Sequence, residues 1–346
     1  MLAGLNGIMT KYLSSKLTVL YTLLIIMVVY IHSYYLEARQ YPNVLFIQNF
    51  CGTKGVCRIA NCLFFCISGY LFARNITSSK DVWIKLKNRW RSLLPPYILW
   101  NIIFVLWFVV LAIVPGADRF NNSGAILGRM ATQPVLDSFY EMFVVPAAFH
   151  LWFLRDLLLM LLFTPLLCWI TKKQWSVALL LAICSTVVYS WLVYFWLGII
   201  IAMQRWDIEN YQRPKWAIAA GIVLFVGYSI YLALGNNGIM FIGLFTNLIG
   251  IYLVWVLYDI IACGRCLSDM ACGKYIYGYS FFIYLFHEPA LNVIKKLPLF
   301  LCGTSEPVLI FFFLVNPWIM VAVAVITAKI LQHMTPRMYK ILTGGR

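Results

Sequence analysis

The chain has 346 residues, of which 63% are hydrophobic and only 11% are charged, and its formal net charge is +15. This balance excludes a soluble globular domain, in which about 25% of residues are charged. Apolar stretches of about 18 residues or more recur along the whole chain, so the sequence predicts an all-α polytopic membrane protein. The positive charge is then explained by basic cytoplasmic loops, and no nucleic-acid partner is expected.

We expect about ten membrane-spanning helices, with residues 1–346 forming a single integral-membrane domain. The expected spans are 17–35, 57–74, 96–114, 150–170, 175–189, 191–204, 216–234, 239–261, 275–294 and 308–331. An even number of spans places both termini on one side, and most Lys and Arg residues outside the spans fall on that side. By the positive-inside rule, both termini are predicted to be cytoplasmic.

Three of the four histidines fall at a similar depth in this topology. His32 lies near the outer end of the first span, His150 opens the fourth, and His287 lies in the outer half of the ninth. An imidazole inside a membrane is costly unless it faces protein or water. His32 alone could be an interfacial residue of an aromatic belt beside Tyr34 and Tyr35. Three imidazoles at one level favour a shared polar cavity.

The ninth span, YGYSFFIYLFHEP, places Ser280, Tyr284 and His287 on one helical stripe. Glu288 follows directly, and Pro289 is expected to kink the helix. The acidic neighbour could simply cap a helix end. An ionisable pair inside an apolar segment instead favours a functional site, in which Glu288 orients His287.

Arginine occurs in two further spans. Arg155 and Asp156 enter the membrane about one turn below the histidine level and could pair locally. Adjacent residues diverge by about 100° on a helix, so we expect Arg155 to point into the cavity instead. Arg58 lies near the outer level of the second span, where Ser68 shares its face. The pair Ser68-Gly69 also suits close helix packing.

A basic stretch, KLKNRWR, precedes two prolines on the predicted cytoplasmic side. It could anchor the chain on anionic lipid. Alternatively, Lys87, Arg89 and Arg91 could bind a phosphorylated cytosolic ligand, because Lys and Arg are the usual partners of phosphate oxygens.

The cysteines give weaker signals. The Cys-x2-Cys motif at 263–266, with Cys272, resembles half of a zinc site, but no fourth ligand lies nearby and no metal is predicted. Cys51 and Cys57 could form a disulfide with each other or with Cys302 on an oxidising face.

Five motifs, in order, resemble the acyltransferase-3 family of integral-membrane O-acyltransferases. They are the outer His of the first helix, FFCISGYLF, KNRWRSLLPPY, HLWFL and SFFIYLFHEP, beginning at His32, Phe64, Lys87, His150 and Ser280. The resemblance covers nearly the whole chain. It implies a bacterial inner-membrane enzyme that moves an acyl group, most often acetyl, from a cytosolic coenzyme A thioester to a hydroxyl of a cell-envelope or exported glycan. No tightly bound cofactor is implied, and acetyl-CoA is a co-substrate.

One position departs from the family pattern. Members often carry Arg eleven residues before the first-helix His, and this chain has Tyr21 there. Tyr21 and His32 share a helix face about 16 Å apart, so the geometry of the pair is retained without its charge. Arg58 or Arg155 could supply that charge.

These observations predict a set of roles. His32 is expected to be the general base, and Arg58, Arg155 and His287 complete the catalytic group. The expected substrate contacts are His150, Trp152, Ser68, Tyr284, Glu288 and Tyr21. The expected acyl-CoA contacts are Lys87, Arg89 and Arg91. A double displacement through an acyl-His intermediate stays open.

The main alternative is a transporter or flippase of a lipid-linked saccharide, which would also carry charge within the membrane. The two halves show no inverted repeat and no paired broken helices, which favours the enzyme. The acceptor, the acyl length and the oligomeric state are not indicated by the sequence.

Overall fold

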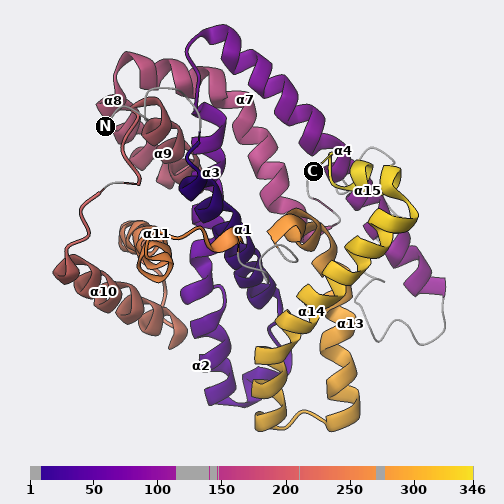
Figure 1. The fold of residues 1–346 in the computed structure, drawn as a ribbon. Coiled ribbons are helices and arrows are strands. Elements are labelled where there is room, and N and C mark those ends of the chain that lie inside the picture. Colours follow the sequence, from indigo (N-terminus) through magenta and orange to yellow (C-terminus); the bar gives the residue numbers. More distant parts are fainter. Residues whose placement is uncertain are drawn as a thin grey trace. The chain divides into compact units, whose positions relative to one another are not determined.

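The computed structural model describes residues 9–113, 140, 146, 148–209, 211–269 and 277–345, with the backbone alone at 108, 111, 112 and 289. Every regular element in these ranges is a helix, as predicted (Figure 1). The α-helices are α1 (Lys11–His32), α2 (Pro42–Cys51), α3 (Ile59–Ala73), α4 (Ser79–Ile113), α7 (Trp152–Lys173), α8 (Trp175–Cys184), α9 (Leu192–Met203), α10 (Lys215–Ala233), α11 (Met240–Ala262), α13 (Ser280–Cys302), α14 (Glu306–Met334) and α15 (Pro336–Leu342). The 3₁₀ helices are η1 (Leu36–Gln40), η2 (Val56–Arg58), η4 (Phe149–Leu151), η5 (Ser185–Val187), η6 (Leu267–Asp269) and η7 (Tyr277–Tyr279).

Six helical stretches in the described residues are long and apolar enough to cross a membrane, fewer than the sequence led us to expect. They are Lys11–His32, Pro42–Ala73, Phe149–Lys173, Lys215–Ala233, Met240–Ala262 and Glu306–Met334. Each overlaps one predicted span. The second begins earlier than predicted, because α2 is helical where a loop was expected. The cytoplasmic placement of both termini stays a prediction.

At the other four predicted spans, the helices differ from the prediction for physical reasons. Helices α8 and α9 have 10 and 12 residues. They are therefore about 15–18 Å long, roughly half of the hydrocarbon thickness that a span must cross. Helix α4 has 35 residues and continues through Pro95 and Pro96, so the basic stretch before the prolines is helical and not a loop. Helix α13 covers most of the predicted ninth span and is interrupted within it.

Two compact units make up the chain. Unit 1 contains Met1–Lys85 and Phe163–Ser280, and unit 2 contains Leu86–Leu162 and Phe281–Arg346. Each has its own buried core, with Phe65 and Phe195 in the first and Phe282 and Phe313 in the second. The single domain expected from the sequence stays a prediction. Most of the segment 115–149, between the third and fourth predicted spans, lies outside the described residues, as does Cys272.

Within unit 1, α3 and α9 pack backbone to backbone at two glycines. A Cβ at Gly69 would lie 1.9 Å from the carbonyl oxygen of Phe195, and one at Gly198 would lie 2.0 Å from the carbonyl oxygen of Cys66. Only a hydrogen atom fits at either position, which is the small-residue packing typical of membrane helices. The close-packing interpretation of Ser68-Gly69 is therefore confirmed at Gly69.

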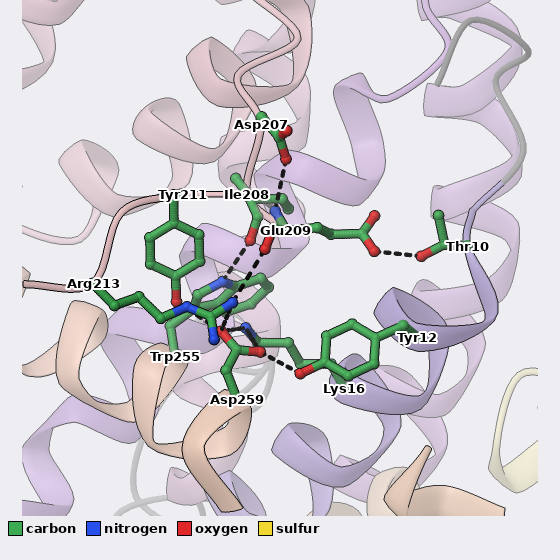
Figure 2. A network of polar contacts seen from close by, with 10 residues as sticks. All are labelled: Thr10, Tyr12, Lys16, Asp207, Ile208, Glu209, Tyr211, Arg213, Trp255 and Asp259. Carbon is green, nitrogen blue, oxygen red and sulfur yellow. Dashed lines mark hydrogen bonds and ion pairs between the residues drawn. The ribbon is translucent and has the colours of Figure 1, made fainter. Parts of the chain in front are cut away.

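A buried ion pair joins α1 to α11 in the same unit (Figure 2). Nζ of Lys16 lies 2.8 Å from each carboxylate oxygen of Asp259, and neither side chain is more than 1% exposed. The ammonium also lies 3.9 Å from the centroid of the Trp255 ring. The predicted first span begins at residue 17, whereas α1 begins at Lys11 and buries Lys16. The pair satisfies two charges that have lost their water.

The segment between α9 and α10 covers this ion pair (Figure 2). The Tyr211 hydroxyl donates a hydrogen bond of 2.8 Å to Asp259, and Arg213 lies 3.4 Å from the same carboxylate. From α1, the Tyr12 hydroxyl donates to Asp259 at 2.6 Å. Burial and the hydrogen bond to Asp259 raise the pKa of Tyr211, so its hydroxyl stays a neutral donor. Asp259 therefore ties two helices and a connecting segment together.

Replacing Gly69 with Ala should destabilise unit 1 by about 1–3 kcal/mol, because the added methyl group forces α3 away from α9. Gly227→Ala on α10 is the matched control, since a Cβ there meets no heavy atom within 4 Å. The control should be neutral or slightly stabilising. Thermal unfolding of the purified protein in detergent measures both variants, and equal melting temperatures would contradict the packing argument.

Asp259→Asn should cost about 3–5 kcal/mol, because it leaves the Lys16 ammonium buried without its counter-charge. The double variant Lys16→Met/Asp259→Asn should recover most of that loss, since it removes the buried cation and keeps an acceptor for both tyrosines. Glu209→Gln, at an exposed hydrogen bond to Thr10, should change the stability by less than about 1 kcal/mol. Thermal unfolding in detergent measures all three, and a double variant no more stable than the single one would refute this interpretation.

Candidate active site

Helix α13 is interrupted inside the predicted ninth span. Glu288 has φ −107° and ψ 138°, an extended conformation within the helix. The cause is the following residue, Pro289, because a proline ring disfavours helical backbone at the residue before it. The predicted kink is therefore confirmed. A proline nitrogen also carries no hydrogen, so the carbonyl of Leu285 lacks the donor that an uninterrupted helix would provide.

Unit 2 brings two of the three predicted histidines together. His150, in η4, and His287, in α13, are 2% and 0% exposed. Their ring centroids lie 4.9 Å apart with an interplanar angle of 71°. Asn101 on α4 helps to hold η4, since its side-chain oxygen accepts from the Ala148 N–H at 3.2 Å. His32 belongs to unit 1.

Backbone carbonyls of α13 orient both rings. His287 Nδ1–H donates to the Tyr284 carbonyl at 2.7 Å, and His150 Nε2–H donates to the Leu285 carbonyl at 3.2 Å. A carbonyl can only accept, so these contacts place the protons of the neutral rings on those two nitrogens. The lone pairs are then on Nε2 of His287 and Nδ1 of His150. The Tyr284 hydroxyl donates to the His150 carbonyl at 3.0 Å, which is a further link between η4 and α13.

Aromatic rings line this histidine pair. The centroid of His150 lies 5.7 Å from that of Phe104, 5.9 Å from that of Phe149 and 6.2 Å from that of Tyr284. Such surroundings admit little water, so contacts within the protein decide the orientation of the rings.

Glu288 is buried and accepts a hydrogen bond of 2.7 Å from Asn292 on the same helix. The sequence predicts that Glu288 orients His287. The Tyr284 carbonyl orients the His287 ring instead, because it accepts a hydrogen bond from His287 Nδ1–H. The extended backbone at Glu288 explains the difference, because it removes the residue from the stripe that it would share with its neighbours in a regular helix.

Arg155 and Asp156 form the local pair, which was the less favoured of the two predicted arrangements. Arg155 Nε donates to Asp156 at 2.7 Å, and one terminal guanidinium nitrogen lies 2.7 Å from the same oxygen. The expectation that Arg155 turns away from its neighbour is therefore wrong. Its flexible side chain overcomes the 100° divergence of the backbone positions, and the pairing neutralises a carboxylate that is only 4% exposed.

Arg58 holds several parts of unit 1 together. It donates to Asn247 at 2.8 Å, to Ser229 at 2.7 Å and to the carbonyl of Gly55 at 3.0 Å. Its guanidinium carbon lies 4.6 Å from the centroid of the Phe225 ring. All of its described partners are neutral, so its charge is not matched by a carboxylate among the described residues.

The other predicted residues of unit 1 lie on α1 and α3. His32 is the last residue of α1 and is partly buried, as are Tyr21 and Ser68. The Tyr21 ring lies 5.6 Å from the Phe64 ring, centroid to centroid. Tyr21, where the resemblance led us to expect arginine, is thus an aromatic packing residue.

The remaining predicted contacts belong to unit 2. Trp152 begins α7 and packs its ring edge-on against Phe153. Lys87, Arg89 and Arg91 lie on α4, where Lys87 and Arg91 are exposed and Arg89 is partly exposed. None of the three forms an ion pair with a described residue, which leaves their charges available to an anionic ligand.

The polar groups that pair deep in the helices are not among the predicted site residues. Asp259 lies within the predicted span 239–261, and an acidic residue inside an apolar run was a usable signal. Asn247 and Ser229, which bind Arg58, carried no such signal because neutral polar residues are common in spans. Nine cysteines are described and all are free. The described residues contain no cluster of His, Cys, Asp and Glu that could hold a metal.

The sequence is similar to a known protein family and to a known protein, and both similarities bear on the reaction class. Residues 16–329 match the acyltransferase-3 family model, described as an acyltransferase domain. The chain is also 26% identical over 295 residues to the succinoglycan biosynthesis protein ExoH of Rhizobium meliloti (strain 1021), covering 81% of this chain and 77% of that protein. No solved structure matches. The match spans both units and the motifs around His32, His150 and His287, and the chain therefore belongs to the acyltransferase-3 family of membrane acyltransferases.

Proposed function

We propose that this protein transfers an acyl group, acetyl in the simplest case, from cytosolic acyl-CoA to a hydroxyl group of an exported polysaccharide. Family membership over residues 16–329 is the observation on which this proposal rests. The name of the relative ExoH, a succinoglycan biosynthesis protein, supports a polysaccharide as the acceptor. We place the protein in a bacterial inner membrane, with the acceptor on the extracytoplasmic side and no tightly bound cofactor.

The reaction requires one proton to move. The acceptor oxygen attacks the thioester carbon, its hydrogen passes to an imidazole lone pair, and the carbon–sulfur bond breaks. The thiolate then leaves and takes up the proton, which regenerates the neutral imidazole. Negative charge develops on the former carbonyl oxygen, so a nearby donor or cation lowers the barrier.

Our assignment of roles keeps His32 as the general base and His287 as a second catalytic imidazole. Arg58 is the better electrostatic partner, because its described contacts are all neutral, whereas Arg155 is neutralised by Asp156. His150, Tyr284, Trp152 and the residues around them contact the substrates. Lys87, Arg89 and Arg91 hold the phosphates of the acyl donor.

His32→Ala should lower kcat for acetyl transfer in isolated membranes by about 10²–10⁴-fold, because it removes the base. His333→Ala, at an exposed position near the end of α14, is the control and should leave kcat unchanged. His287→Gln in the same assay separates the two candidate bases. A wild-type rate for His32→Ala would remove His32 from the mechanism.

Acetyl-CoA should raise the melting temperature of the detergent-solubilised protein, by an amount equivalent to about 2.7 kcal/mol at 100 times its dissociation constant. Arg89→Ala/Arg91→Ala should abolish most of this shift, since it removes two phosphate-binding cations. Lys172→Ala, an exposed cation at the end of α7, should retain it. A transporter of lipid-linked saccharides has no reason to respond to acetyl-CoA, so the absence of a shift in the wild type would favour that class.

A further inference from the structure

Pro289 has a consequence for a residue that is far away in the sequence. In an unbroken α-helix, the N–H of residue 289 would donate to the carbonyl of residue 285. A proline cannot donate, and the backbone at Glu288 is extended, so α13 does not satisfy the Leu285 carbonyl in the usual way. A carbonyl inside an apolar unit needs another donor.

That donor is His150. Its Nε2 lies 3.2 Å from the Leu285 oxygen, and the whole residue is only 2% exposed. A buried carbonyl without a donor destabilises the folded protein, so this contact selects the tautomer of His150 that can donate from Nε2. The lone pair of the neutral ring is then fixed on Nδ1.

His287 has the opposite tautomer for a different reason. Its Nδ1 lies 2.7 Å from the Tyr284 carbonyl and 3.3 Å from the Ile283 carbonyl, both in the preceding turn of its own helix. These contacts depend only on local helix geometry. The two rings, 4.9 Å apart between centroids, therefore have their lone pairs on different nitrogens. Of the two tautomers, only that of His150 depends on the break in α13.

We propose that Pro289 is a positioning residue that sets the tautomer of His150. Because Pro289 has no N–H to donate, the Leu285 carbonyl accepts a hydrogen bond from His150 Nε2–H instead. The effect of this arrangement on acyl transfer rests on the proposed function. The tautomer itself does not, because it follows from the carbonyl contact. The arrangement holds a proton-accepting nitrogen of His150 in one orientation before any substrate binds.

The direct test is ¹⁵N NMR of histidine-labelled protein in lipid nanodiscs. The chain has four histidines, so His→Gln variants at each position assign the spectrum. The expected result is His150 protonated on Nε2 and His287 protonated on Nδ1. Protonation of neutral His150 on Nδ1 in the wild type would overturn the proposal, whatever the activity of the enzyme.

Pro289→Ala tests the cause. The new N–H competes for the Leu285 carbonyl, so we expect a mixture of His150 tautomers while His287 stays protonated on Nδ1. Pro317→Ala, which restores an N–H inside α14 of the same unit, should leave both tautomers unchanged. An unaltered His150 spectrum in folded Pro289→Ala would refute the role of the proline.

Tyr284→Phe covers the case in which Pro289→Ala does not fold. It removes the hydroxyl contact to the His150 carbonyl but leaves the Leu285 carbonyl in place, so His150 should keep its Nε2 proton. Loss of that proton position would mean that the tyrosine, and not the free carbonyl, fixes the ring, and the proposal would fail.

Acetyl transfer gives a separate readout. Pro289→Ala should lower kcat by up to roughly 100-fold with little change in KM for acetyl-CoA, because it disturbs orientation and not binding. Full activity in a variant with mixed tautomers would show that the positioning has no catalytic role. If the wild type transfers no acyl group, the proposed function fails, and the NMR result still decides the tautomer.

Discussion

Polar groups buried among apolar helices must find partners inside the protein, since neither lipid nor a dry core supplies them. This constraint explains the best-defined contacts in both units. The Lys16 ammonium has Asp259, the Arg58 guanidinium has carbonyl, amide and hydroxyl oxygens, and the His150 N–H has the Leu285 carbonyl. Most of these partners, Asp259, Asn247, Ser229 and Leu285, come from another element, so satisfying a polar group also fixes how elements pack.

The two units use this constraint differently. In unit 1, the Lys16–Asp259 pair is closed, because hydrogen-bonding and ionic partners surround the carboxylate and an aromatic ring covers the ammonium. This ion pair stabilises the packing of α1 against α11, and its charged groups are occupied by one another. In unit 2, carbonyls take one N–H from each imidazole and leave a lone pair on the other nitrogen. That arrangement fixes the orientation of both rings before any substrate binds.

Membership of the acyltransferase-3 family gives these features a chemical context. The proposed function requires an anionic thioester donor to bind and a proton to leave the acceptor. Exposed cations on α4 suit the first task, and oriented imidazoles suit the second. Arg58 is a partly buried cation of unit 1 whose described partners are all neutral.

The sequence by itself determined the helical class, six of the membrane-crossing segments and the break in α13, because composition and proline act locally. It also selected His150 and His287 as functional candidates, since imidazoles are rare in apolar runs. Only the tertiary structure decided which groups meet. It paired Arg155 with Asp156, gave the orientation of His287 to Tyr284 and not to Glu288, and joined Lys16 to Asp259 across 243 positions. Periodicity assigns a residue to a face, but the partner on that face comes from another part of the chain, and only folding brings the two together.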